Sequence, residues 1–419
     1  MDRRRLLALV VLVVGLSVFA VYLGLVAALV VTGGSDAADY TAFYTGWTIV
    51  LEGRGADLYD PAVQAEVQRQ VLGGRSFEAG LNPFNNPPHL VLPFVPLALL
   101  PLTASYVTWA VVQIGLLLWL LRRLLTTVAA EWSREERSLL VAASVALPSL
   151  ALTLWQGAFS LLVTVAVFEL YLALVAGRDR ASGVWAVIGS LKPQAVAGFG
   201  VMLIAARRWQ AVAGALVVGG GLVLAATLVL GIGIWTSYLG FLREYVASFD
   251  TFSVRPSVMW NVRGTLAIWF GPEIDAQEAA LINGIALAVQ VLGLVAIAAL
   301  WIRRWEPATD AFRLRFAATI LIGILTSAHL NPHDGLLLIP AAVLAYGALR
   351  TTRSGPALGV GLAAAPFLIL VLNPLSVNEP GGPPVRVPVA LCVILLGVVL
   401  AALRVARPSQ LTAQPSPTR

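Results

Sequence analysis

The chain has 419 residues, of which 58% are apolar and 12% are charged, whereas an average soluble domain has about 45–50% apolar and about 25% charged residues. This composition excludes a soluble globular protein, and the one cysteine, Cys392, excludes both a disulfide framework and a cysteine metal site. The net charge of +6 comes from arginine pairs between apolar runs, a pattern that argues against nucleic-acid binding and is typical of cytoplasmic loops in membrane proteins.

Apolar stretches recur along the chain, most of them close to the length of roughly 20 residues that a bilayer-spanning helix needs. The first, 6–31, follows three arginines and is too long for a signal peptide core, so we interpret it as a membrane helix. Between 182 and 206, two shorter pieces broken at Lys192-Pro193 predict a helical hairpin buried in protein. The sequence therefore predicts an all-α polytopic membrane protein with about 12 membrane segments, two of them in the hairpin. The remaining ten are 6–31, 103–121, 138–155, 158–176, 210–232, 281–302, 316–330, 335–349, 356–372 and 387–403.

The arginines assign a side of the membrane to each loop. Successive loops must alternate between the two sides of the membrane. All the basic pairs can be placed on the cytoplasmic side, together with the N-terminus, without breaking this alternation, so both termini are predicted to be cytoplasmic. The opposite, extracytoplasmic side then holds the long loops 32–88 and 233–278. Two segments of the first loop have the pattern of interfacial helices, 40–51 and 61–72. We expect residues 1–406 to form one transmembrane domain and 407–419 a disordered cytoplasmic tail.

Lys192 is the only lysine among the 28 basic residues, and it lies inside an apolar stretch. An ionisable group at membrane depth is a functional candidate by default, although a lysine can also extend its ammonium group to the membrane surface without any function. A compact cation at the outer end of a broken hairpin suits a lipid-linked phosphate.

Two carboxylates, Asp36 and Asp39, follow the first predicted helix at the outer membrane surface. Either one can cap the helix that follows, and this interpretation is strongest for Asp36. Asp39 directly precedes an aromatic run and is our candidate for a general base that acts on a hydroxyl. We therefore name both residues as catalytic candidates and favour Asp39.

A polar cluster, His329, His333 and Asp334, lies at a predicted outer turn. The residue types suit a metal, but Pro332 interrupts the helix and no HExxH glutamate is present, so we expect no metal site. A histidine that contacts phosphate or handles a proton, oriented by Asp334, is the favoured interpretation.

The second outer loop contains Asn261 and Arg263, with Trp260 and Trp269 on either side. Aromatic residues bind sugar faces, but they also form interfacial belts, and composition does not separate the two roles. The sequence has no Gly-rich phosphate loop, nucleophile elbow or zinc motif, and its inner loops are too short for a nucleotide-binding domain.

Several patches, in this order along most of the chain, resemble glycosyltransferase family 87 of the GT-C superfamily. They begin with the Asp39-to-Tyr44 run and continue through later short motifs. These are Leu58-Tyr59-Asp60, Phe84-Asn85-Asn86-Pro87-Pro88, Pro96 to Pro101, Trp155-Gln156-Gly157, Leu191-Lys192-Pro193-Gln194, Asn261-Val262-Arg263-Gly264 and Ser327 to Asp334.

The resemblance implies a GT-C membrane enzyme that transfers a sugar, mannose above all, from a polyprenyl-phosphate carrier to a lipid or glycan acceptor. Asp39 would deprotonate the acceptor hydroxyl, which attacks with inversion of configuration on the extracytoplasmic side of the plasma membrane. We expect no cofactor or metal. The residues expected to bind or orient the donor phosphate are Lys192, Gln194, Asn261, Arg263, His329, His333 and Asp334.

Three other functions remain open at this point. A lipid-linked glycan polymerase or ligase has a similar body with large outer loops. A transporter would place polar residues at the midplane, often with internal repeats, and a membrane scaffold gives no reason for Lys192. Within the transferase interpretation, arabinose and glucose remain alternatives to mannose.

Overall fold

The structure is a computed structural model. It describes residues 3–31, 38–77, 80–248, 252, 254–271, 273–302, 304–372 and 386–405. Throughout these ranges the chain forms helices and their connections, with no strand, which confirms the predicted all-α class. Two predicted features lie outside the described residues, namely Asp36 and the tail 407–419.

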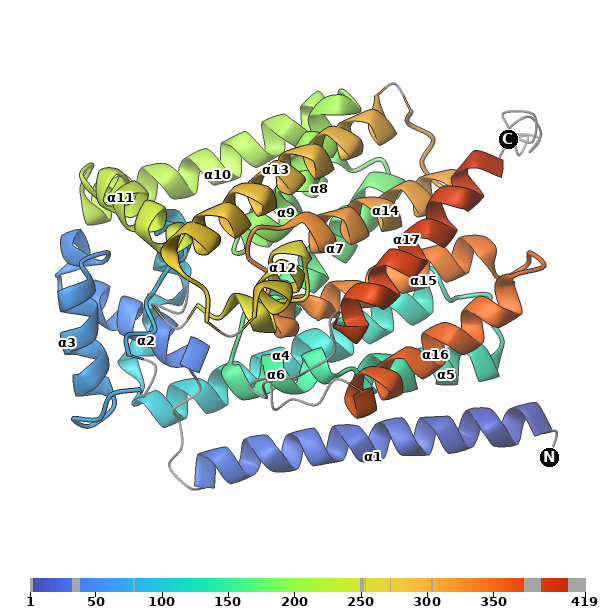
Figure 1. The fold of residues 1–419 in the computed structure, drawn as a ribbon, viewed down its shortest axis with the longest axis horizontal. Helices are drawn as coiled ribbons and strands as arrows, with labels where there is room; N and C mark the ends of the chain where they lie inside the picture. The colour runs from blue at the N-terminus through green and yellow to red at the C-terminus, as the bar shows by residue number, and fades with distance from the viewer. Residues whose placement is uncertain are drawn as a thin grey trace.

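Seven helical segments are long and apolar enough to cross a membrane, and a bent pair adds an eighth. This shows a multi-pass membrane protein, while the predicted count of 12 segments is not confirmed. The first helix begins and the last one ends at the same end of the molecule (Figure 1). The seven are α1 (Arg3–Val31), α4 (Leu102–Thr126), α10 (Trp209–Leu230), α13 (Ala276–Trp301), Pro332–Leu349, which joins η5 (Pro332–Leu337) to α15 (Leu338–Leu349), α16 (Gly355–Leu372) and α17 (Val387–Val405).

The bent pair replaces the single span predicted over 138–155. It consists of α5 (Arg134–Ala146) and α6 (Pro148–Gln156), whose axes differ by 44°. Pro148 has no N–H to donate and stands at the first position of α6, where a helix tolerates proline. The break therefore starts a new helix, and α6 ends beside the polar cluster described below.

Shorter helices complete the fold and confirm two other predictions. Helices do form at the two segments of the first loop, and the chain does break before Pro193. Helices α2, α3 and α11 gather at one end of the molecule (Figure 1). These elements are α2 (Ala38–Leu51), η1 (Gly55–Asp57), α3 (Pro61–Val71), η2 (Pro88–Leu90), η3 (Leu92–Leu99), α7 (Ser160–Val175), α8 (Asp179–Gly189), α9 (Pro193–Ala205), α11 (Ile234–Ala247), η4 (Pro256–Val258), α12 (Val262–Phe270) and α14 (Asp310–Thr326).

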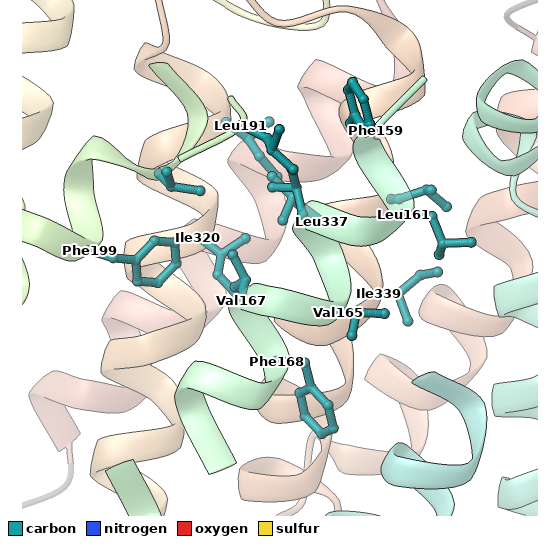
Figure 2. Packing of buried hydrophobic residues seen from close by; sticks show 14 of the residues in the cluster. Phe159, Leu161, Val165, Val167, Phe168, Leu191, Phe199, Ile320, Leu337 and Ile339 are labelled. Carbon is teal, nitrogen blue, oxygen red and sulfur yellow. The ribbon is translucent and has the colours of Figure 1, made fainter. Parts of the chain in front are cut away.

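Helix α7 is the buried centre of the fold. It is apolar on all sides, as expected of a helix surrounded by protein, and nearly all of its 16 residues are buried. Figure 2 shows its side chains in the same cluster as Phe199 of α9, Ile320 of α14 and Ile339 of α15. This packing fixes the position of Ser160, the first residue of the helix, next to Asp334 of the polar cluster.

Gly157 is the point where α6 packs closely against α2, the helix that carries Asp39. It ends α6 with a φ of 63°, in the left-handed region, and a Cβ at this position would lie 2.7 Å from Cβ of Tyr40. We expect Gly157→Ala to lower the free energy of unfolding by about 1–3 kcal/mol, measured by thermal unfolding of the purified protein.

The matched control for this substitution is Gly53→Ala. Gly53 also has a positive φ, 77°, but no atom lies within 4 Å of its added Cβ. The control carries the backbone strain without the contact, so it should destabilise the protein less. Equal losses in the two variants would show that contact with Tyr40 contributes nothing.

Candidate functional site

Three predicted site residues from distant parts of the chain meet at one point. Asp39 lies in the first turn of α2, Lys192 directly precedes α9, and His333 is the second residue of η5. Nδ1 of His333 lies 3.7 Å from Oδ2 of Asp39, and Nε2 lies 2.8 Å from Nζ of Lys192. The carboxylate and the ammonium group thus occupy opposite edges of one imidazole ring.

Lys192 has a fixed position at the start of a helix. Pro193 is the first residue of α9, where its missing N–H has no cost. The lysine side chain is only 12% exposed, and its Nζ donates to Oδ1 of Asp334 at 2.6 Å and to Nε2 of His333. An ammonium group has three N–H donors, and acceptors among the described residues take two of them, which leaves one for a ligand.

Asp334 lies behind Lys192 and anchors it. Its carboxylate is 3% exposed and accepts from Oγ of Ser160 at 2.7 Å and from the backbone N–H of Asn331 at 3.1 Å. A buried carboxylate is stable only when it is paired and hydrogen-bonded. These partners meet that need, so Asp334 holds the lysine rather than facing a ligand.

Gln156, the last residue of α6, is a further partner in this network. Its Oε1 lies 2.7 Å from Nδ1 of His333. Sequence reasoning gave no role to Gln156 or Ser160, although the motif containing Gln156 contributed to the family resemblance. Ser160 carried no signal, because a serine that opens an apolar helix looks like any other.

A second group of polar side chains surrounds Arg263. The guanidinium group donates to the carbonyl of Ser248 at 2.9 Å and is buried. The ring centroid of Tyr245 of α11 lies 5.7 Å from that of His329. Burial lowers the pKa of Arg263 to about 10, so the group remains a cation at neutral pH. Burial raises the pKa of Tyr245, which keeps its hydroxyl protonated.

His329 is held neutral by its surroundings. Burial, with a further contribution from the nearby charge of Arg263, lowers its pKa from 6.5 to about 3. The folded protein then binds fewer protons than the unfolded chain between these two pH values, so acidification through this window destabilises the fold.

We expect the imidazole of His329 to show no titration when the pH is lowered from 8 to about 5. It can be measured by NMR of the protein labelled with ¹⁵N-histidine, since the chain has three histidines. His329→Gln assigns the signal by its disappearance. Half-protonation near pH 6.5 would contradict the burial argument.

The other two predicted ligands occupy different positions. Asn261 is fully buried and caps α12, since its Oδ1 accepts from the N–H of Gly264 and its Nδ2 donates to the carbonyl of Ser327. This joins α12 to the segment that carries His329. Gln194, in the first turn of α9, faces the cavity described next.

A cavity of about 1420 Å³ lies beside both groups. Six predicted site residues line it, namely Asp39, Lys192, Gln194, Arg263, His329 and His333. Polar side chains of α13, Asn283 and Gln290, also line the cavity, as do four apolar ones, Leu239 and Leu242 of α11 and Ala280 and Leu287 of α13. We call these four apolar residues the apolar wall. Because α13 is long enough to cross a membrane, the cavity extends along a candidate membrane helix.

Within the described ranges, no group of three or more His, Cys, Asp and Glu side chains is placed to hold a metal ion. Three cationic side chains line the cavity among the described residues, namely Lys192, Arg243 and Arg263.

Comparison with protein families decides the class of the protein. Residues 84–332, more than half of the chain, match glycosyltransferase family 87. The chain belongs to this family. It is therefore a membrane glycosyltransferase, as the sequence motifs predicted, and the GT-C superfamily is consistent with this membership. No curated protein and no solved structure matches the chain.

The family match covers part of the candidate site of this glycosyltransferase. Lys192, Gln194, Asn261, Arg263 and His329 all lie within the matched residues. The remaining candidates lie outside it, namely Asp36, Asp39, His333 and Asp334. Hydrogen bonds from Lys192 to His333 and Asp334 connect the matched segment to the turn that follows it.

Proposed function

We propose that this glycosyltransferase moves a sugar, mannose in the first instance, from a polyprenyl-phosphate carrier to a hydroxyl of a lipid or glycan acceptor. The observation that carries the proposal is a cavity lined both by charged site residues and by apolar side chains of α13, a helix of membrane-spanning length. Its volume exceeds the roughly 300–1,000 Å³ of a site for a small ligand. A sugar phosphate attached to a long hydrocarbon chain likewise combines a charged, polar part with an apolar part.

The donor phosphate binds between the two cations in this proposal. Lys192 offers its remaining N–H, and Arg263 offers a second positive group on the cavity lining. The first isoprene units lie along the apolar wall in this proposal. The donor carries a single phosphate and no nucleotide, in agreement with the short inner loops of the sequence.

Asp39 is the general base of the proposed reaction. It takes the proton of the acceptor hydroxyl, whose oxygen forms a bond to the anomeric carbon as the bond from that carbon to the phosphate oxygen breaks. The electron pair of that bond leaves with the polyprenyl phosphate, whose added negative charge Lys192 and Arg263 stabilise. The proposed base and one proposed cation lie on opposite edges of His333, and inversion needs the attacking oxygen and the leaving phosphate oxygen on opposite faces of the anomeric carbon.

The proposed site opens on the extracytoplasmic side of the plasma membrane. Its residues come from the loop after α1, the break before α9 and the turn before α15. The positive-inside pattern of the arginines assigns these segments to the outer face. A carrier lipid that has moved its sugar across the membrane would present it there.

A donor comparison tests this function. The full-length protein in lipid nanodiscs is given polyprenyl-phosphate mannose, glucose or arabinose, or GDP-mannose, with a membrane lipid extract as acceptor. We expect transfer from a lipid-phosphate donor and none from GDP-mannose. Transfer only from glucosyl or arabinosyl carriers would change the sugar but keep the class. Transfer from GDP-mannose alone would overturn the proposal.

A further inference from the structure

The hydrogen bonds of His333 determine where its proton lies. An ammonium group only donates hydrogen bonds, so Nε2 of His333, 2.8 Å from Nζ of Lys192, must accept. A neutral imidazole carries its proton on the other nitrogen, so Nδ1 is the donor. Its acceptor is Oε1 of Gln156, at 2.7 Å. A doubly protonated ring would place an N–H against the ammonium group of Lys192.

The same Nδ1 faces Asp39 at a longer distance. Oδ2 of Asp39 lies 3.7 Å away, beyond a normal hydrogen bond, whereas Gln156 is within one. A carboxylate that accepts an N–H is a weaker base, because the bond favours its charged form. Gln156 thus occupies a donor that would otherwise reduce the basicity of Asp39.

We propose that Gln156 is a positioning residue that holds His333 as the neutral Nδ1–H tautomer and keeps this N–H away from Asp39. The proposal rests on the proposed function in one respect, namely that Asp39 is the base. His333 then acts as a neutral spacer: it fixes the ammonium of Lys192 on one edge and leaves the carboxylate of Asp39 free on the other.

The charged groups around His333 come from three elements. Asp39 faces it from α2, Lys192 from the start of α9 and Asp334 from η5, with His329 close enough to interact electrostatically. Asp334 is already bonded to Lys192, Ser160 and the N–H of Asn331. Gln156 is therefore the neutral group that accepts the Nδ1 proton of His333 and stabilises this tautomer.

The first test does not depend on activity. In the full chain labelled with ¹⁵N-histidine, the imidazole signal that disappears in His333→Gln should show a proton on Nδ1 and none on Nε2. In Gln156→Leu the signal should change, since the N–H then has only Asp39 to bond. A wild-type imidazolium, or an Nε2–H tautomer, would overturn the proposal even if no sugar were transferred.

The second test uses the pH dependence of kcat in wild type, Gln156→Leu and Gln156→Glu. The leucine variant should have a kcat about tenfold lower, an unchanged KM for the donor and an acid limb moved to lower pH. In the glutamate variant a second carboxylate faces Asp39, so its acid limb should move to higher pH.

Gln113→Leu removes another buried glutamine, from α4, and should not move the acid limb. If the acid limb of kcat shifts in the same direction in both Gln156 variants, or does not shift in either, Gln156 only packs the fold. An inactive wild type would instead count against the proposed function and leave the NMR result to decide the tautomer.

Discussion

Asp39→Asn is expected to lower kcat by about 10²–10⁴-fold, the usual contribution of a general base. The amide keeps the size of the side chain but has no lone pair basic enough to take the hydroxyl proton. The KM for the donor should change little, because the donor phosphate is bound by cations on other elements. Steady-state transfer from the polyprenyl-phosphate donor measures both constants.

Two controls accompany this variant. Asp57→Asn changes an exposed aspartate of the same loop and should leave kcat unchanged. Asp39→Glu keeps a carboxylate and should recover part of the activity. Full activity in a folded Asp39→Asn protein would remove Asp39 as the base and leave Asp36 as the remaining carboxylate that the sequence proposes.

Lys192→Met is expected to act on both stability and catalysis. It removes one cation from the proposed phosphate site, which costs about 10²–10³-fold in kcat/KM. It also leaves the carboxylate of Asp334 buried without its ammonium partner, a change that costs about 3–5 kcal/mol. Thermal unfolding and transfer kinetics separate the two effects.

The double variant Lys192→Met with Asp334→Asn distinguishes anchoring from phosphate binding. Neutralising the buried carboxylate should restore most of the lost stability, because no unpaired charge remains. Activity should stay low, since the cation is still missing. Recovery of both properties would show that Lys192 serves the fold alone.

Much of the fold could be predicted because membrane helices follow directly from long apolar runs. The break before Pro193 could also be predicted, because proline lacks an N–H and fixes its own φ. The bend at Pro148 was missed, since the apolar pattern of 138–155 continues through it. The number of spans could not be settled either. A buried helix such as α7 is as apolar as one that faces lipid, and composition does not separate them.

The candidate site could be predicted in its residues but not in its connections. Asp39, Lys192 and His333 were each singled out for their chemistry, and the structure brings them together across hundreds of residues. No sequence pattern shows which polar side chains meet in three dimensions, so the partners Gln156 and Ser160 went unrecognised. Asn261 was placed among the phosphate ligands. Its N-cap role has a local signature, since asparagine is favoured directly before a helix.

The most direct test of the central claim is a structure of Asp39→Asn, in lipid nanodiscs, with polyprenyl-phosphate mannose bound. The account predicts the phosphate within about 3 Å of Nζ of Lys192, the sugar between the phosphate and the first turn of α2, and the isoprene chain along the apolar wall. A donor phosphate that contacts neither Lys192 nor Arg263 would contradict it.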